Sequence, residues 1–189
     1  MEMYTIGHST HTEEAFLSLL NEYEIRLLVD VRTFPGSRYV PQFNKENMEI
    51  WLPQNNIKYL HLPELGGRRH KNKDIDGSLV DGWKNAAFRN YAAYSLTPGY
   101  EEGIERLIEL AKETKVCYMC SEAVPWRCHR LLISNTLVSR GISIYHIISE
   151  NDLITHKLGM YGATPVESGS QLIYPPAEAE PVETPKNPE

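Results

Sequence analysis

The sequence predicts a single α/β domain built on a mainly parallel five-stranded sheet, with helices on both faces. Short apolar stretches alternate along the chain with segments whose apolar residues recur at helical spacing. The clearest strand, residues 26–31 (RLLVDV), is apolar through its middle, as expected for a strand covered on both faces. The 189 residues contain no internal repeat and no linker, so one domain is expected.

The expected elements follow one another in order. Strands are expected over residues 3–6, 26–31, 57–62, 115–120 and 143–148. Helices are expected after Thr10 or Thr12 and over residues 45–55, 83–94, 98–113 and 128–141. Threonine and asparagine are good N-caps, so Thr12 or Thr10 can start the first helix and Asn44 the second. Gly141 favours the left-handed backbone that ends a helix. This alternation is typical of a Rossmann-like, three-layer fold.

Two segments lack such patterns. Residues 63–82 are rich in turn formers and charges, and a stretch of this length without regular structure often forms a lid or a binding loop. Residues 165–189 hold six of the twelve prolines and end in an acidic run. A segment of this composition buries little apolar surface, so we expect a flexible tail after a domain of residues 1–164.

Composition excludes several classes of function. The formal net charge is −6, which excludes a generally basic surface for nucleic acid but leaves room for local basic patches. No apolar run approaches the roughly 18 residues of a membrane span, and the N-terminus lacks the pattern of a signal peptide. Three cysteines do not make a disulfide framework, so reduced thiols and a cytoplasmic location are expected, with no membrane partner.

Polar side chains follow the carboxyl ends of the expected strands. In an open parallel sheet these ends share one edge, where ligands bind. Six of the ten arginines fall on these loops in a chain that is acidic overall, which indicates a shared anion-binding site rather than scattered surface ion pairs. The residues predicted to bind the anion are Ser9, Asp30, Arg32, Ser37, Arg38, Arg68, Arg127, His129 and Arg130.

The stretch CYMCSEAVPWRCHR carries the sharpest chemical signal. Cys120 ends an expected strand, and Cys128 lies at the expected start of a helix. A thiol at a helix N-terminus near cationic side chains has a lowered pKa, because the helix dipole and the charges favour the thiolate. Cys128 or Cys120 is therefore a candidate nucleophile. The alternative is that both are inert, buried side chains.

Two further residues are candidates for proton transfer. Glu122 is expected in the same pocket and can act as general acid or base, or can form a stabilising ion pair. His8 follows the first strand and can move protons or serve as a structural hydrogen-bonding group. A structural zinc site is not expected, because Cys117 and Cys120 lie three apart on a strand and point to opposite faces. No metal and no cofactor are predicted.

Five segments stand in order between Tyr4 and Ile148: YTIGHST, LLVDVRTFPGSR with the PQFN that follows, LPELGGRR and MCSEAVPWRCHR. Together, and in this order, they resemble the DUF488 family, whose members have no agreed activity. The resemblance implies a compact α/β domain. The positions that match the family signature are Gly7, His8, Ser9, Asp30, Arg32, Pro35, Ser37, Arg38, Phe43, Gly66, Gly67, Cys120, Glu122, Cys128, His129 and Arg130.

A weaker likeness connects the chain to rhodanese-type α/β domains. In those domains an aspartate-valine-arginine sequence also ends a strand, and a catalytic cysteine precedes an anion-binding loop. Here the segment from Cys120 to Arg127 is one residue longer than the usual loop, and Pro125 and Trp126 stiffen it. This departure argues against direct transfer of a sulfurtransferase or phosphatase activity.

Three hypotheses of function follow from these residues. The first is an enzyme acting on a small anionic, phosphate-bearing or nucleotide substrate, either a transferase or a hydrolase. Its catalytic candidates are Cys128, Cys120, Glu122 and His8. The second is a module that binds or processes nucleic acid, in which Arg38, Arg68 and Arg69 contact backbone phosphates. Trp126 or Tyr39 would then stack on a base. The third is a non-catalytic regulatory domain whose polar cluster only holds loops in place. The sequence does not specify the oligomeric state.

Overall fold

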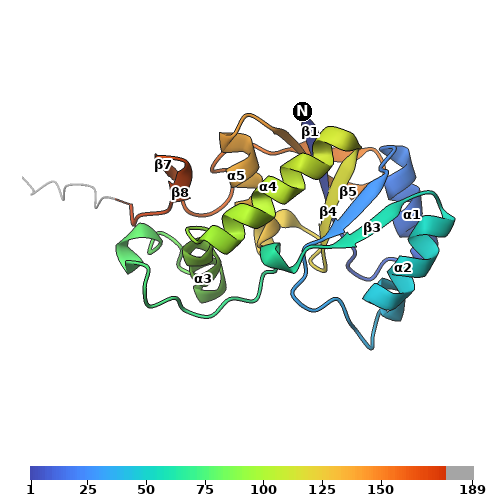
Figure 1. Ribbon diagram of the computed structural model, residues 1–189, viewed down its shortest axis with the longest axis horizontal. Helices are drawn as coiled ribbons and strands as arrows, with labels where there is room; N and C mark the ends of the chain where they lie inside the picture. The colour runs from blue at the N-terminus through green and yellow to red at the C-terminus, as the bar shows by residue number, and fades with distance from the viewer. Residues whose placement is uncertain (178–189) are drawn as a thin grey trace, which may run out of the picture.

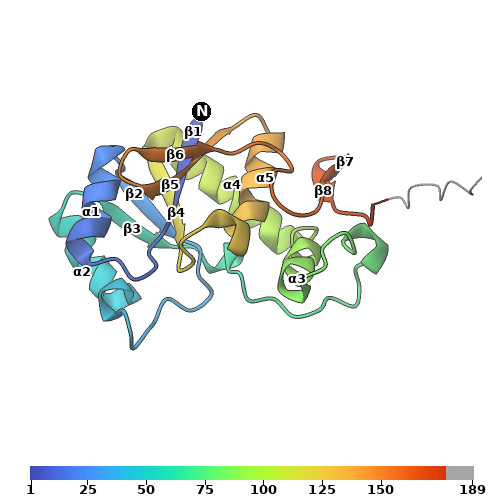
Figure 2. The same ribbon diagram turned by 180° about the vertical axis from the view of Figure 1, so that it is seen from behind.

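A computed structural model describes residues 1–177 and shows one α/β unit around a six-stranded sheet (Figure 1). The strand order is β3-β2-β4-β1-β5-β6. The strands are β1 (Glu2–Gly7), β2 (Leu27–Asp30), β3 (Lys58–His61), β4 (Val116–Cys120), β5 (Ser143–Ser149) and β6 (Asp152–Thr155). The first five pair in parallel, and β6 pairs antiparallel with β5 at one edge (Figure 2). The predicted parallel α/β fold is therefore confirmed.

Helices cover both faces of the sheet, as expected for three layers. The helices are α1 (Glu13–Glu22), α2 (Lys45–Gln54), α3 (Ala86–Tyr94), α4 (Pro98–Glu113) and α5 (Arg130–Ser139). The apolar sides of α1 and α2 pack in one buried cluster with one face of the strands, and α3, α4 and α5 belong to the cluster on the other face (Figure 1). Side chains alternate along β4 accordingly, so Cys117 joins the first cluster and Cys120 the second.

Local signals in the sequence account for the helix starts. The Thr12 side chain accepts a hydrogen bond from the Ala15 backbone N–H at 3.2 Å and so caps α1. Asn44 precedes α2, but its side chain accepts from the Ser37 N–H and thereby holds the loop after β2. At the end of α5, Gly141 has a φ of 78°, the left-handed conformation expected there.

The chain is more regular at its C-terminal end than the sequence predicts. Strand β6 was not expected, and a hairpin of β7 (Val166–Ser168) and β8 (Gln171–Ile173) lies in the segment predicted to be a tail. Leu172 and Tyr174 are buried, and the Tyr174 N–H donates to the Leu79 carbonyl at 2.7 Å. Packing against the long loop therefore anchors the hairpin. The rest of the predicted tail, residues 178–189, lies outside the described residues.

A buried chain of polar groups connects this C-terminal region to the centre of the sheet. The His146 and His156 rings lie 3.0 Å apart, between nitrogens Nε2 and Nδ1. His146 Nδ1 faces the Thr5 hydroxyl at 3.3 Å, and His156 Nε2 faces the Asn135 side-chain oxygen at 2.9 Å. Burial lowers the pKa of His146 to about 3 and that of His156 to about 4, so both rings are neutral.

Among residues 1–177, no helix combines the length and the apolar character that crossing a membrane requires.

Candidate functional site

A cavity of about 490 Å³ opens at the carboxyl ends of β1, β2 and β4. The loops after these strands form its wall together with Gly67, Arg68, α3 and the segment leading into α5. The sequence-predicted residues that line it are His8, Ser9, Arg32, Ser37, Arg68, Cys120, Glu122, Arg127, Cys128 and His129. Segments far apart in the sequence thus meet at one edge of the sheet. Asp30, Arg38 and Arg130 do not line the cavity.

The loops after β1 and β4 are joined by backbone hydrogen bonds. The His8 N–H donates to the Cys120 carbonyl at 3.0 Å, and the Ser9 N–H donates to the Ser121 carbonyl at 2.9 Å. A Cβ atom added at Gly7 would lie 1.9 Å from the Glu122 carbonyl oxygen. Only glycine permits this approach, so Gly7 fixes the distance between the two loops.

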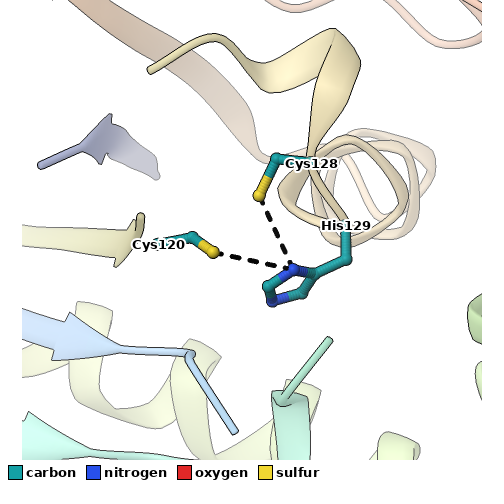
Figure 3. Close-up of side chains that lie close together, drawn as sticks. All are labelled: Cys120, Cys128 and His129. Atoms are coloured by element: carbon teal, nitrogen blue, oxygen red, sulfur yellow. Dashed lines mark hydrogen bonds between the residues drawn. The ribbon is translucent and has the colours of Figure 1, made fainter. Parts of the chain in front are cut away.

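The chemical centre of the cavity is a group that we call the sulfur–imidazole cluster, which consists of Cys120, Cys128 and His129 (Figure 3). Cys120 comes from the end of β4, and the other two residues immediately precede α5. His129 Nδ1 lies 3.8 Å from Cys120 Sγ and 3.6 Å from Cys128 Sγ. Both cysteines are buried, at 7% and 3% exposure, yet they face the cavity.

The tautomer of His129 follows from its second nitrogen. Nε2 lies 2.9 Å from the Val31 carbonyl oxygen, which can only accept, so Nε2 carries the proton and donates. The lone pair of Nδ1 then points at the two sulfurs. Gly67 allows this placement of the ring, because a Cβ atom there would come within 2.4 Å of Nδ1.

The two thiols differ in acidity. Burial alone would raise the pKa of Cys128, but the thiol of Cys120 and the Arg130 charge, together with hydrogen bonds from Arg130, outweigh it and lower that pKa below its usual value. The Arg130 backbone N–H lies 3.5 Å from Cys128 Sγ. The hydrogen bond to Cys128 and burial raise the pKa of Cys120. Cys128 is therefore the more acidic thiol of the pair, and the Nδ1 lone pair of His129 is placed to accept its proton.

Arg32 is held rigidly at the wall of the cavity. Its Nη2 donates to Asp30 Oδ2 at 2.6 Å and to the Phe43 carbonyl at 2.7 Å. Asp30 is fully buried and also accepts from the Tyr59 hydroxyl at 2.8 Å. Asp30 therefore orients and neutralises Arg32.

His8 has no free ring nitrogen. Nδ1 lies 2.9 Å from the Ser9 carbonyl and must donate to it, so Nε2 accepts from Arg32 Nη1 at 2.9 Å. Burial and the nearby Arg32 charge lower the pKa of His8 to about 4. This neutral ring positions Arg32, and it lacks the free nitrogen that proton transfer requires.

Arg130 lies beneath the cavity rather than in it, contrary to its predicted role in anion binding. Its side chain is fully buried, donating to the Thr5 hydroxyl at 2.7 Å and to the Glu122 carbonyl at 2.5 Å. Within residues 1–177 it has no carboxylate partner. The buried charge of Arg130 therefore favours loss of the proton from the neighbouring Cys128 thiol. Arg38 is exposed, outside the cavity wall.

The remaining charge at the cavity is positive. Arg32 is neutralised by Asp30, which leaves Arg68 and Arg127 against Glu122 among the charged lining residues. Arg68, Arg127 and Glu122 are exposed and can move toward a ligand. An anion entering the cavity therefore meets two arginines and one carboxylate.

Aromatic residues of the cavity were largely missed by sequence reasoning. The side chains of Phe34, Tyr39, Phe88 and Tyr91 line it, and of these only Tyr39 was considered as a stacking group. Phe88 and Tyr91 lie three residues apart on α3, a spacing that equally fits a core-facing helix. Tyr91 is in fact almost fully buried, with its ring centroid 5.0 Å from that of His129.

The fold and the cavity define a class, an α/β protein with a ligand-sized cavity over the carboxyl edge of parallel strands. Residues 12–137 match a family model described as "Domain of unknown function DUF488". The chain therefore belongs to the DUF488 family, and the resemblance noted in the sequence is confirmed. The match begins after His8 and Ser9, so these two cavity residues lie outside it. Searches of curated proteins and of solved structures gave no significant match.

Proposed function

We propose that the protein is an enzyme that acts on an anionic, phosphate-bearing or nucleotide substrate in this cavity, with Cys128 Sγ as the nucleophile. One observation carries the proposal: a thiol aligned with an imidazole and a backbone N–H faces the same cavity as Arg68 and Arg127, which form no ion pair with any of residues 1–177. Thiolate nucleophiles commonly combine such neighbours. Glu122 is the mobile acid or base beside them.

The aromatic side chains at the cavity favour a nucleotide over a simple anion. Phe34 is 69% exposed and Tyr39 is 96% exposed, although large apolar side chains are usually covered. Arg68 lies over the Phe34 ring, at 5.8 Å from its centroid. A flat base can stack on these rings while its phosphate meets Arg68 and Arg127. The volume of about 490 Å³ falls within the roughly 300–1,000 Å³ typical of small-molecule sites.

A thermal-shift screen tests the binding half of the proposal. Nucleotides, inorganic phosphate and thiosulfate are screened against the wild type and the double variant Arg68→Ala/Arg127→Ala. The matched control is Arg106→Ala, an exposed arginine of α4 outside the cavity wall. A nucleotide that raises the Tm of the wild type and the control, but not of the double variant, identifies the substrate class. Equal shifts in all three proteins would refute the anion site.

The chemical half is tested with the ligand found in the screen. Cys128→Ser is expected to retain ligand binding but to lose turnover by several orders of magnitude, since a hydroxyl is a far weaker nucleophile than a thiolate. Turnover undiminished in this variant would exclude Cys128 as the nucleophile. A different outcome would support a regulatory domain: Cys128→Ser has a lower Tm but unchanged ligand binding, and neither the wild type nor the variant shows turnover.

A second candidate function, binding of single-stranded nucleic acid, is favoured by one observation. Arg38 and Tyr39 are both exposed beside the cavity, and Trp126 is 38% exposed on the loop after β4. The affinity of such binding would fall steeply as salt rises. The logarithm of the binding constant should fall with the logarithm of the salt concentration, with a slope of about −0.7 for each phosphate neutralised. A flat salt dependence with short oligonucleotides would exclude it.

A further inference from the structure

We propose that the sulfur–imidazole cluster is a binding site for one Zn²⁺ ion, with Cys120, Cys128 and His129 as ligands and a fourth coordination position open to the cavity. The proposal goes beyond the proposed function and rests on the geometry of these three side chains alone. It requires neither an anionic substrate nor turnover.

The distances match those of a tetrahedral metal site. With Zn–S bonds of about 2.3 Å and a Zn–N bond of about 2.0–2.1 Å, tetrahedral angles place sulfur and nitrogen roughly 3.6 Å apart. The two sulfur–nitrogen distances here are 3.8 and 3.6 Å. No two of the three ligand atoms are more than 4.8 Å apart. One ion can therefore contact all three after small side-chain movements.

The surroundings of the cluster prepare the ligands for a metal. Zinc-bound histidines usually donate their other ring N–H to a carbonyl or a carboxylate, which fixes the tautomer and the ring orientation. His129 does this through Nε2 to the Val31 carbonyl, leaving the Nδ1 lone pair toward the sulfurs. The backbone N–H of Arg130 lies 3.5 Å from Cys128 Sγ, where it stabilises a thiolate ligand. These contacts are the outer-shell contacts that such a site requires.

The donor set selects the ion. Thiolate and imidazole are soft to borderline ligands that suit Zn²⁺, whereas Mg²⁺ and Ca²⁺ require oxygen ligands. Two thiolates balance the charge of one divalent ion. Cys117 lies on the other face of the sheet, so it cannot join the cluster as a fourth ligand. In the described part of the chain, no histidine, cysteine or carboxylate joins the cluster as a fourth ligand. Three protein ligands with an open position are typical of zinc sites that bind water or substrate.

Cys128 cannot bind zinc and act as a nucleophile at the same time. In the loaded protein its sulfur is a ligand and is no longer free to attack, so zinc would protect both cluster thiols from alkylation. The fourth position would take an oxygen atom of water or of a bound anion. Zinc binding and the thiol reaction can thus be measured separately, and the failure of one leaves the other unaffected.

The test titrates the reduced, chelator-treated full chain with Zn²⁺ by calorimetry and with Co²⁺ by absorption spectroscopy. We expect one ion per chain, a tetrahedral Co²⁺ spectrum and a thiolate-to-cobalt charge-transfer band. Cys120→Ser, Cys128→Ser and His129→Ala should each lose about 100-fold or more in affinity, since outer-shell changes alone cost about 10–100-fold. The matched control is Cys117→Ala, which should retain the wild-type affinity and spectrum.

A second measurement keeps the test decisive if a variant misfolds. Alkylation of the wild type with iodoacetamide, read by peptide mass spectrometry, should show Zn²⁺ protecting Cys120 and Cys128. Unchanged alkylation of these two thiols at saturating Zn²⁺ would overturn the proposal. An octahedral Co²⁺ spectrum without a thiolate band would also overturn it, as would equal affinities in the wild type and the folded cluster variants.

Discussion

Replacing Arg130 by alanine distinguishes an arginine that supports the fold from one that binds substrate. Its guanidinium is fully buried and makes two short hydrogen bonds, to the Thr5 hydroxyl and to the Glu122 carbonyl. Hydrogen bonds from a charged donor contribute about 1.5–3 kcal/mol each, so Arg130→Ala should reduce the free energy of unfolding by about 3–6 kcal/mol. That is a large share of the roughly 5–15 kcal/mol typical of a domain.

Urea denaturation followed by circular dichroism measures the change. With an m-value of about 2 kcal/mol/M, the expected loss lowers the midpoint by about 1.5–3 M. Arg127→Ala is the matched control, because Arg127 is exposed, and its loss should change stability by less than about 0.5 kcal/mol. If Arg130→Ala were as stable as Arg127→Ala, the role of Arg130 in supporting the fold would be refuted.

Three further perturbations test other parts of the structure. Gly7→Ala should prevent stable folding, because the added Cβ would lie 1.9 Å from the Glu122 carbonyl oxygen. Gly36→Ala is the matched control: its Cβ would have no atom within 4 Å, so the Tm should not change. Asp30→Asn should cost about 3–5 kcal/mol in urea unfolding, because it leaves the buried guanidinium beside it unpaired. Stability should fall as pH drops below 6.5, because the folded-state pKa values of His8, His146 and His156, about 4, 3 and 4, lie below this ordinary value. Each histidine contributes about 1.4 kcal/mol per pH unit to this fall, until pH reaches its folded pKa.

Each of these predictions has an outcome that would contradict it. A soluble Gly7→Ala protein with an unchanged Tm would show that the loops after β1 and β4 can separate without cost. Wild-type stability of Asp30→Asn would mean that Arg32 finds another partner. For the pH prediction, His156→Asn should reduce the dependence of the urea midpoint between pH 6.5 and 4.5. An unchanged slope in that variant would assign the effect to other groups.

Much of the sheet could be predicted because its strands carry strong local signals. Residues 27–29 and 116–120 are continuous apolar runs, and both belong to buried central strands. Strand β6 was not predicted because DLIT (152–155) is short and mostly exposed at the edge of the sheet. An exposed edge strand shows little alternation of apolar and polar residues. The β7–β8 hairpin was hidden by the average composition of 165–189, although Leu172 and Tyr174 within it are buried.

The candidate site was predictable in outline but not in its assignments. The rule that parallel strands share a carboxyl edge brought ten predicted residues to one cavity. The rule says nothing about the direction of a side chain. Arg130, close to Cys128 in sequence, was therefore expected to bind the anion but is fully buried and does not line the cavity. The aromatic wall from α3 was missed because Phe88 and Tyr91 look like ordinary core residues of a helix.

The position of β1 in the sheet also determines how much of the chain must be kept when the protein is shortened for expression. This strand pairs with β4 on one side and β5 on the other, yet both β1 and β5 lie outside the family-matched residues 12–137. A fragment cut to that match would leave β4 as an unprotected edge, and such edges invite aggregation. The limits of sequence similarity are therefore poor limits for cloning, and a fragment that retains residues 1–177 preserves every strand pairing described for the fold.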